Sequence, residues 1–159
     1  MKTKKLYILI APPCSGKSTW VRNKIATLNC PYIASTDDII TSMYPDLTYN
    51  EAYAKVNFKE AKRLMREGVA DAFKQGNDII IDRTNMSIKT RKEFIKSVDD
   101  TYEKIAVVFP WDKDTFIKRN ESRMITEGKF ISLKLWEDFC SNYQRPTKEE
   151  GFDKIEFLK

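Results

Sequence analysis

The sequence contains no histidine and only three cysteines among its 159 residues. The absence of histidine excludes Ser-His-Asp and Cys-His nucleophile schemes, so proton transfer is left to carboxylates, lysine or tyrosine. Cys14, Cys30 and Cys140 are odd in number, widely spaced and without a CxxC pair. They therefore indicate neither a disulfide framework nor a zinc site, and they favour a reducing compartment.

Long apolar runs are also missing. A bilayer span needs about 20 consecutive apolar residues, whereas the apolar run near the N-terminus covers residues 6–10 only. That run is too short even for the core of a signal peptide. We expect a soluble, cytoplasmic protein with no membrane partner.

The composition suits one globular domain over residues 1–159, because 42% of the residues are hydrophobic and the chain is too short for a second domain of ordinary size. The formal net charge is +5. A basic surplus favours anionic partners such as nucleotides or nucleic acid, although a solvated lysine-rich surface explains it equally well.

The segment Ala11–Ser18, APPCSGKS, directly follows the apolar run 6–10. A buried strand, a tight glycine turn, a lysine and a serine at the start of a helix are the parts of a phosphate-binding loop. The first glycine of GxxxxGK[ST] is Ala11 here, which is the smallest departure from the pattern. The loop predicts binding of ATP and Mg²⁺, with the nucleotide contacted by Pro13, Cys14, Ser15, Gly16, Lys17, Ser18 and Thr19 and the metal by Ser18.

Hydrophobic periodicity predicts strands that alternate with helices, and hence an α/β fold: a three-layer P-loop NTPase fold with a mainly parallel sheet and a helical lid. Thr48 and Glu51 have the spacing of a capping box at the start of one long helix. We expect strands at 6–10, 31–34, 78–82, 104–109 and 154–158, and helices at 19–28, 38–43, 48–75, 88–98, 112–124 and 132–143.

Three polar clusters, at 11–18, 35–38 and 82–85, follow predicted strands and should meet at one edge of a parallel sheet. Asp37 could accept the proton of an incoming hydroxyl, or it could serve with Asp38 as a helix N-cap. Asp82 has the place of an acid that holds Mg²⁺, with a solvated strand end as the alternative.

Lys118, Arg119 and Arg123 lie close together on a predicted helix that leads into the polar segment 126–129. Arg119 and Arg123 are four residues apart and share a helix face, which is typical of a lid (118–131) that closes over phosphates; an ordinary solvated face is the alternative. The aromatic side chains Trp111, Trp136 and Phe139 are expected to pack in the core rather than to stack on bases.

Over residues 5–145 the chain resembles the phage-type polynucleotide 5′-kinase domain, a P-loop kinase. The resemblance rests on four blocks: APPCSGKSTW, the pair Asp37-Asp38, IIIDRTNMS and FPWDKDTFIKRNESR. It implies an ATP- and Mg²⁺-dependent transfer of phosphoryl to the 5′-hydroxyl of RNA or DNA in nucleic acid repair. It also implies that Lys17 and Ser18 bind ATP and Mg²⁺, that Asp37 is the general base and that Arg123, assisted by Arg119, stabilises the transferring phosphoryl.

Two departures concern the acceptor. The best-known phage enzymes have an arginine three residues beyond the catalytic aspartate, where this chain has Ile40, and Arg83 stands where an acid or asparagine is more usual. The expected acceptor contacts are Asp38, Arg83, Thr84 and Asn85, with Lys89, Arg91 and Lys92 lining the mouth of the site.

The chain leaves no room for the phosphatase module of some relatives, so a separate ligase or phosphatase partner would be needed for end repair. A kinase of nucleotides or other small molecules, and a nucleotide-responsive binding module with little turnover, remain alternatives.

Overall fold

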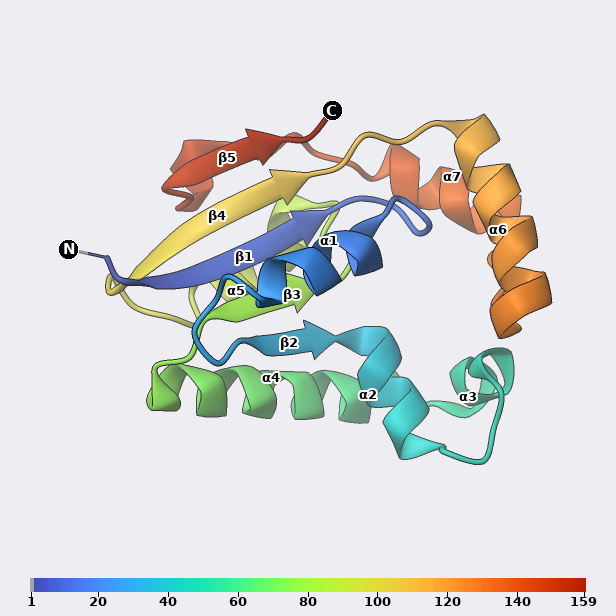
Figure 1. Cartoon of the computed structure of the whole chain (residues 1–159), viewed down its shortest axis with the longest axis horizontal. Coiled ribbons are helices and arrows are strands. Elements are labelled where there is room, and N and C mark those ends of the chain that lie inside the picture. The colour runs from blue at the N-terminus through green and yellow to red at the C-terminus, as the bar shows by residue number, and fades with distance from the viewer. Residues whose placement is uncertain (1) are drawn as a thin grey trace.

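The computed structural model describes residues 2–159 and contains one sheet of five strands in the order β2-β3-β1-β4-β5, with every neighbouring pair parallel (Figure 1). The predicted parallel α/β sheet is therefore confirmed. The strands are β1 (Lys4–Ile10), β2 (Tyr32–Ser35), β3 (Ile79–Asp82), β4 (Tyr102–Val108) and β5 (Lys154–Phe157).

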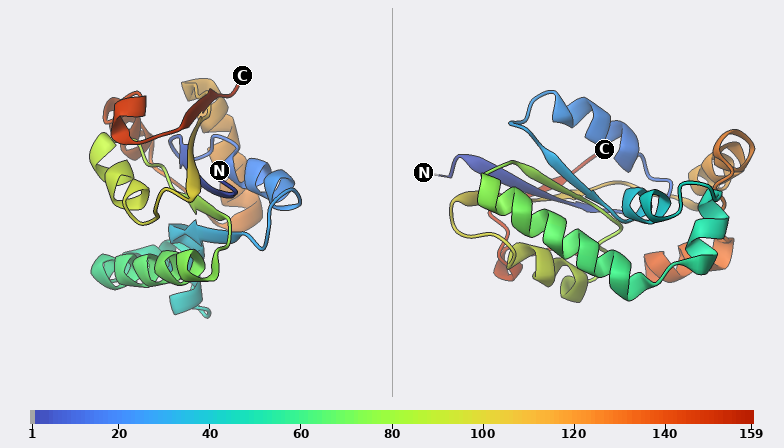
Figure 2. Two further views of the ribbon diagram at one scale, coloured as in Figure 1. Left: turned by 90° about the vertical axis from the view of Figure 1, so that its left-hand side faces the viewer. Right: turned by 90° about the horizontal axis from the view of Figure 1, so that it is seen from below.

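Helices cover both faces of the sheet, with α1 on one side and α4 and α5 on the other (Figure 2). None of the helices within residues 2–159 has the length and apolar character needed to cross a membrane. They are α1 (Lys17–Ile25), α2 (Thr36–Met43), α3 (Tyr49–Lys55), α4 (Phe58–Gln75), α5 (Ile88–Ile95), α6 (Lys113–Glu127) and α7 (Leu133–Ser141), with a short 3-10 turn at Lys148–Glu150.

The central strand β1 shows why its sequence is a continuous apolar run. Leu6 and Ile8 belong to the core beneath α4 and α5, whereas Tyr7 and Leu9 belong to the core beneath α1. A strand buried on both faces needs apolar residues at every position rather than at alternate ones. Each fully buried aliphatic side chain stabilises the fold by about 1.5–3 kcal/mol, so β1 fixes the position of the loop that follows it.

The single helix predicted for residues 48–75 is wrong, because the structure contains two helices there, α3 and α4. The predicted capping box of Thr48 and Glu51 is present at the start of α3. The break comes at Val56, which is extended, and at Asn57, whose side chain accepts hydrogen bonds from the backbone N–H groups of Lys59 and Glu60. An asparagine cap satisfies the first donors of a new helix, and the break lets α3 turn toward the end of α2 (Figure 1).

The helix predicted for residues 112–124 ends later than expected. Asp112 is the N-cap of α6, as predicted, and accepts the backbone N–H of Thr115. The helix runs to Glu127 and ends at Gly128, which adopts φ 67°. Thr126 and Glu127, predicted as part of a flexible connection, are therefore helical, and the connection begins at the glycine.

Arg91 is not at the mouth of the site, as the sequence suggested, but wholly buried. Its guanidinium pairs with Glu150, at 2.9 Å between Nε and Oε1, and donates to the carbonyl groups of Asn85, Met86 and Gln144. A single side chain thus joins α5, the loop after β3 and the segment before β5. Five donors in a fixed fork make arginine suited to such a position.

Replacement of Arg91 by methionine should destabilise the protein by about 3–5 kcal/mol, because it leaves the carboxylate of Glu150 buried without a partner. Urea denaturation measures the loss. The matched control is Arg66→Met, which breaks an ion pair with Glu93 whose side chains are 61% and 41% exposed; it should cost less than about 1 kcal/mol. Equal losses in the two variants would contradict this account.

Candidate active site

The three predicted polar clusters meet at the carboxyl ends of β1, β2 and β3. In the sheet register Ser35 of β2 stands beside Asp82 of β3. The backbone N–H of Ala11 donates to the carbonyl of Thr84 at 3.0 Å, which ties the loop after β1 to the loop after β3. Parallel strands align their carboxyl ends, so the topology brings together residues that lie far apart in the sequence.

The phosphate-binding loop tolerates alanine in place of its first glycine. Within residues 2–159, positive φ in this loop occurs only at Cys14 (64°) and Gly16 (93°), and Gly16 is the N-cap of α1. Ala11 has no such conformation and is fully buried in the core beneath α1. Its methyl group therefore packs rather than strains the loop. Ser15 closes the turn by donating from Oγ to the carbonyl of Pro12 at 2.9 Å.

Lys17 occupies the position of the phosphate-binding lysine. Its Nζ donates to the carbonyl groups of Ala11 at 2.9 Å and Pro12 at 3.1 Å. Burial lowers the pKa of Lys17 to about 8, and the nearby carboxylates of Asp82 and Asp37 oppose that shift. A cation held only by neutral carbonyl groups in a desolvated place would be better satisfied by phosphate oxygens. The loop therefore fits the phosphates of ATP.

Asp82 ends β3 in surroundings that fit Mg²⁺. Burial raises the pKa of its carboxyl, and the negative charges of Asp37 and Asp38 add to the shift while Lys17 opposes it. A divalent cation would relieve this repulsion. The part of the chain that the structure describes holds no group of three or more His, Cys, Asp or Glu side chains able to bind a metal. Mg²⁺ would therefore need nucleotide phosphates and water in addition to Asp82 and Ser18.

Asp37 is not the N-cap of α2, a role that the sequence left open for it. The N-cap of α2 is Ser35, whose Oγ accepts the backbone N–H of Asp38 at 3.3 Å. The Oδ1 atom of Asp37 instead accepts hydrogen bonds from the hydroxyl groups of Tyr53 and, at 3.4 Å, Tyr49. Asp37 also interacts with the positive charge of Lys17. The carboxylate is thus available to chemistry at the strand ends.

Sequence analysis missed Tyr49 and Tyr53, both on α3. Their rings lie 4.7 Å apart between centroids. Burial, together with the charge of Asp37, raises the pKa of Tyr49 to about 12 and also raises that of Tyr53. The sequence feature that could have identified the pair is their four-residue spacing on a capped helix, which places both side chains on one helix face. Nothing in the sequence, however, indicated that this face meets α2.

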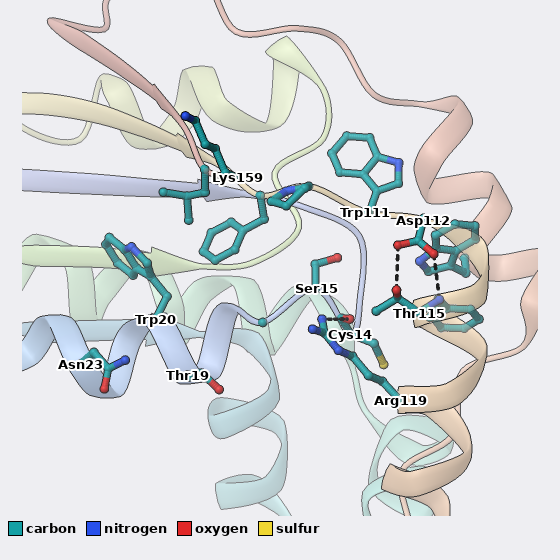
Figure 3. A pocket seen from close by; sticks show the side chains of 16 residues that line it. Cys14, Ser15, Thr19, Trp20, Asn23, Trp111, Asp112, Thr115, Arg119 and Lys159 are labelled. Carbon is teal, nitrogen blue, oxygen red and sulfur yellow. Dashed lines mark hydrogen bonds between the residues drawn. The ribbon is translucent and has the colours of Figure 1, made fainter.

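Both arginines of α6 reach the phosphate-binding loop, as their shared helix face predicted. Arg119 donates from Nη1 to the carbonyl of Cys14 at 3.0 Å (Figure 3), and Arg123 donates from Nη1 to the Cys14 sulfur at 2.8 Å. Arg123 also pairs with Glu127 at 3.5 Å. The third basic residue of the predicted run, Lys118, is exposed. The two arginines therefore form the cationic side of the site.

The residues after β3 have separate roles. Arg83 is half-buried, with its guanidinium 5.6 Å from the centre of the Phe94 ring, and burial lowers its pKa. Asn85 is only 2% exposed, and its Nδ2 donates to the carbonyl of Leu9 at 2.7 Å. Asn85 therefore braces the loop against β1, and its role in substrate binding stays a prediction. Lys89 and Lys92 are exposed on α5.

A cavity of about 460 Å³ adjoins the phosphate-binding loop on the side of α1 and α6 (Figure 3). Its lining combines polar side chains, among them Arg119 and Asp112, with aromatic ones. Trp136 is 5% exposed and stacks on Phe116 at 4.9 Å, so it packs in the core as predicted while it also lines the cavity. An aromatic space beside a phosphate site suits the adenosine part of ATP. The aromatic lining comprises Trp20, Phe109, Trp111, Phe116 and Trp136.

Comparisons with known proteins agree with this geometry. The chain is 27% identical, over 98% of its length, to the transcription factor bHLH140 of Arabidopsis thaliana, of which it covers 16%. It is 24% identical, over 96% of its length, to the bifunctional polynucleotide phosphatase/kinase of Schizosaccharomyces pombe, of which it covers 33%. The chain therefore spans a third or less of the curated relatives it matches.

Among solved structures, a chain of the Pnkp1/Rnl/Hen1 RNA repair complex superposes with a TM-score of 0.72 and 25% identity, over 89% of this chain and 44% of that chain. The predicted resemblance to polynucleotide kinase domains is thereby confirmed, together with the P-loop kinase fold. Residues 6–146 match the family model described as AAA domain. Because that match covers nearly the whole chain, the protein belongs to this AAA domain family of P-loop proteins.

Proposed function

We propose that the protein is an ATP- and Mg²⁺-dependent kinase that transfers the γ-phosphoryl group to the 5′-hydroxyl end of RNA or DNA. The observation that carries the proposal is the placement of a carboxylate, Asp37, beside the phosphate-binding lysine, Lys17, with Arg123 facing the same loop. A hydroxyl acceptor needs a base on one side and cations around the transferring phosphoryl group. The site offers both.

In this proposal the acceptor hydroxyl gives its proton to Asp37 as its oxygen attacks the γ-phosphorus. Lys17 and Arg123 stabilise the negative charge of the transferring group, and Arg119 holds the nucleotide from the same helix face. Bound Mg²⁺ would supply further positive charge at the phosphates, with Ser18 and Asp82 as its protein contacts. The segment 118–131 would act as a lid that carries the arginines over the nucleotide.

The acceptor side of the site differs from the pattern of the best-known phage enzymes. Ile40 is fully buried in a cluster with Ala52 and Ala61, so it cannot contact the acceptor. Arg83 directly follows β3 and interacts electrostatically with Tyr53, a hydrogen-bond partner of Asp37. We propose that Arg83, with Asp38 and Thr84, meets the acceptor, and that exposed Lys89 and Lys92 contact its backbone phosphates.

The names of two relatives support this substrate class, because one is a bifunctional polynucleotide phosphatase/kinase and the other belongs to an RNA repair complex. Since that complex joins Pnkp1 to Rnl and Hen1, we propose that this chain likewise works beside separate enzymes, such as a ligase or a phosphatase. The burial of Ile40 favours one alternative, a small-molecule kinase. A γ-phosphate transfer assay over 5′-hydroxyl oligonucleotides, nucleosides and sugars separates the two readings: efficient use of sugars with no use of oligonucleotides would overturn the proposal.

Replacement of Asp37 by asparagine should lower kcat by about a hundredfold or more, because the amide keeps the shape but cannot accept the proton. The affinity for ATP should change by only a few fold, about 1 kcal/mol or less. Steady-state kinetics and ATP titration measure the two quantities. A large loss of ATP affinity with unchanged kcat would show that Asp37 serves the nucleotide instead.

The Arg123→Lys variant should also lose most activity, by about tenfold or more in kcat, since a point charge does not reproduce the guanidinium fork. Arg66→Lys, at an exposed position on α4, is the matched control and should leave kcat unchanged. If Arg123→Lys were as active as the control, the assignment of the lid arginine would be wrong.

The Arg83→Ala variant should raise KM for a 5′-hydroxyl oligonucleotide far more than KM for ATP. If Lys89 and Lys92 contact backbone phosphates, each one removed should reduce the slope of log affinity against log salt by about 0.7 for a single strand. Lys134→Ala, far from the acceptor side on α7, serves as the matched charge control. A nucleoside 3′-monophosphate should be a better acceptor than the nucleoside. Equal use of the two, with salt-insensitive binding, would support the small-molecule alternative.

A further inference from the structure

We propose that Tyr53 is itself a phosphoryl acceptor, so that the protein phosphorylates this tyrosine within its own active site when no other acceptor is bound. The inference rests on the proposed kinase function. It concerns a modification site on α3, a helix that supplies neither the phosphate-binding loop nor the lid.

The contact that carries the inference joins the Tyr53 hydroxyl to Oδ1 of Asp37, the carboxylate assigned as the base. A general base acts on a proton within hydrogen-bond reach. Tyr53 already meets this requirement. Of the other tyrosines, Tyr49 reaches the same oxygen only at 3.4 Å, the long end of hydrogen-bonding distance.

The ring of Tyr53 is held in place by neighbours on both sides. The Tyr49 ring lies 4.7 Å away between centroids, and the Phe58 ring lies 6.2 Å away at the start of α4. Ala52, next to Tyr53 in sequence, is buried against Ile40 of α2, the helix that carries Asp37. Packing therefore fixes the hydroxyl against the carboxylate, and pre-organised reacting groups lower the entropic part of a barrier.

The hydroxyl lies inside the charged part of the site. Asp37 interacts with the charge of Lys17, Arg123 interacts with Asp37 and Tyr49, and Arg83 interacts with Tyr53. Lys17 and Arg123 are the cations that the proposed kinase reaction places around the phosphoryl group, and Arg83 is the one it places at the acceptor. Burial and the charge of Asp37 raise the pKa of Tyr53, so the phenol keeps its proton at neutral pH and gives it up only during transfer, as an alcohol does.

The reaction balances without any reagent beyond ATP. The phenolic oxygen of Tyr53 forms a bond to the γ-phosphorus, the bond from that phosphorus to the oxygen bridging to the β-phosphate breaks, and ADP leaves. The phenolic proton passes to the Asp37 carboxylate and from there to solvent. The products are ADP and a phosphotyrosine that carries about −1.5 to −2 charges at pH 7, facing Arg83.

The proposal predicts competition between the Tyr53 hydroxyl and an acceptor hydroxyl for the Oδ1 atom of Asp37. An acceptor 5′-hydroxyl that gives its proton to the same Oδ1 atom of Asp37 has to displace the Tyr53 hydroxyl. Saturating acceptor should therefore suppress the modification of Tyr53, and the modified protein should transfer phosphoryl to added acceptors more slowly, because its phosphate blocks the carboxylate.

The test incubates the purified full chain with MgATP and no acceptor, and maps phosphate by peptide mass spectrometry. The expected result is one phosphate on Tyr53, formed at a rate that is independent of protein concentration and suppressed by a 5′-hydroxyl oligonucleotide. Tyr53→Phe should abolish the label and Asp37→Asn should strongly reduce it. Tyr44→Phe, at the C-cap of α2, where the hydroxyl donates to the carbonyl of Lys55 at the end of α3, is the matched control and should keep the label.

Parallel reactions with an added acceptor separate this inference from the proposed function. A wild-type protein that phosphorylates an oligonucleotide or nucleoside, yet leaves Tyr53 unmodified in its absence, overturns the inference alone. Label confined to another residue, or a labelling rate that rises with protein concentration, overturns it as well. A folded protein that transfers phosphoryl to no acceptor and not to Tyr53 overturns both. Because the site is mapped in the wild-type chain, the result does not depend on whether a variant folds.

Discussion

The half-buried ammonium group of Lys17, which lies near two carboxylates at the ends of three parallel strands, is the constraint on which the rest of the site depends. Desolvation opposes its charge and lowers its pKa to about 8, whereas Asp82 and Asp37 oppose that shift. The same desolvation raises the pKa of Asp82. Each charge is therefore tolerated because the opposite charge lies near it. The sheet order β2-β3-β1 secures this arrangement by placing all three strand ends side by side.

Much of this arrangement could be predicted from sequence because it depends on local patterns. The apolar run 6–10, the glycine turn and the lysine fixed the phosphate-binding loop, and strands ending in acids predicted where Asp37 and Asp82 meet it. The four-residue spacing of Arg119 and Arg123 predicted that both face one target, and both contact Cys14. Helical periodicity predicts which residues share a helix face, and the carboxyl ends of parallel strands lie at one edge of the sheet. These two rules predict proximity between residues that are far apart in the sequence.

The remaining features depend on tertiary packing that no local pattern encodes. From the sequence, Arg91 is indistinguishable from the exposed cations of α5. Its burial depends on an ion pair with Glu150, which lies far along the chain. The division between α3 and α4 rests on the side chain of Asn57, a residue that favours caps but is also found within helices. Because that break was not foreseen, the face of α3 that carries Tyr49 and Tyr53 was not expected to meet Asp37.

Four of the site residues already have hydrogen-bond partners in the protein. Lys17 is held by two carbonyl groups of its own loop, Arg119 and Arg123 by Cys14, and Asp37 by Tyr53. At these four residues, binding of a nucleotide and of the proposed acceptor would exchange existing contacts for new ones. Since hydrogen bonds between ions are stronger than those of ions to neutral groups, phosphate displaces a carbonyl or a thiol from the cations with a net gain. An acceptor hydroxyl gains no such advantage over the hydroxyl of Tyr53 at Asp37. In the proposed reaction the nucleotide would therefore bind readily, whereas the acceptor would need binding energy from more remote contacts. On that proposal, α3 is the element that controls which hydroxyl reaches Asp37.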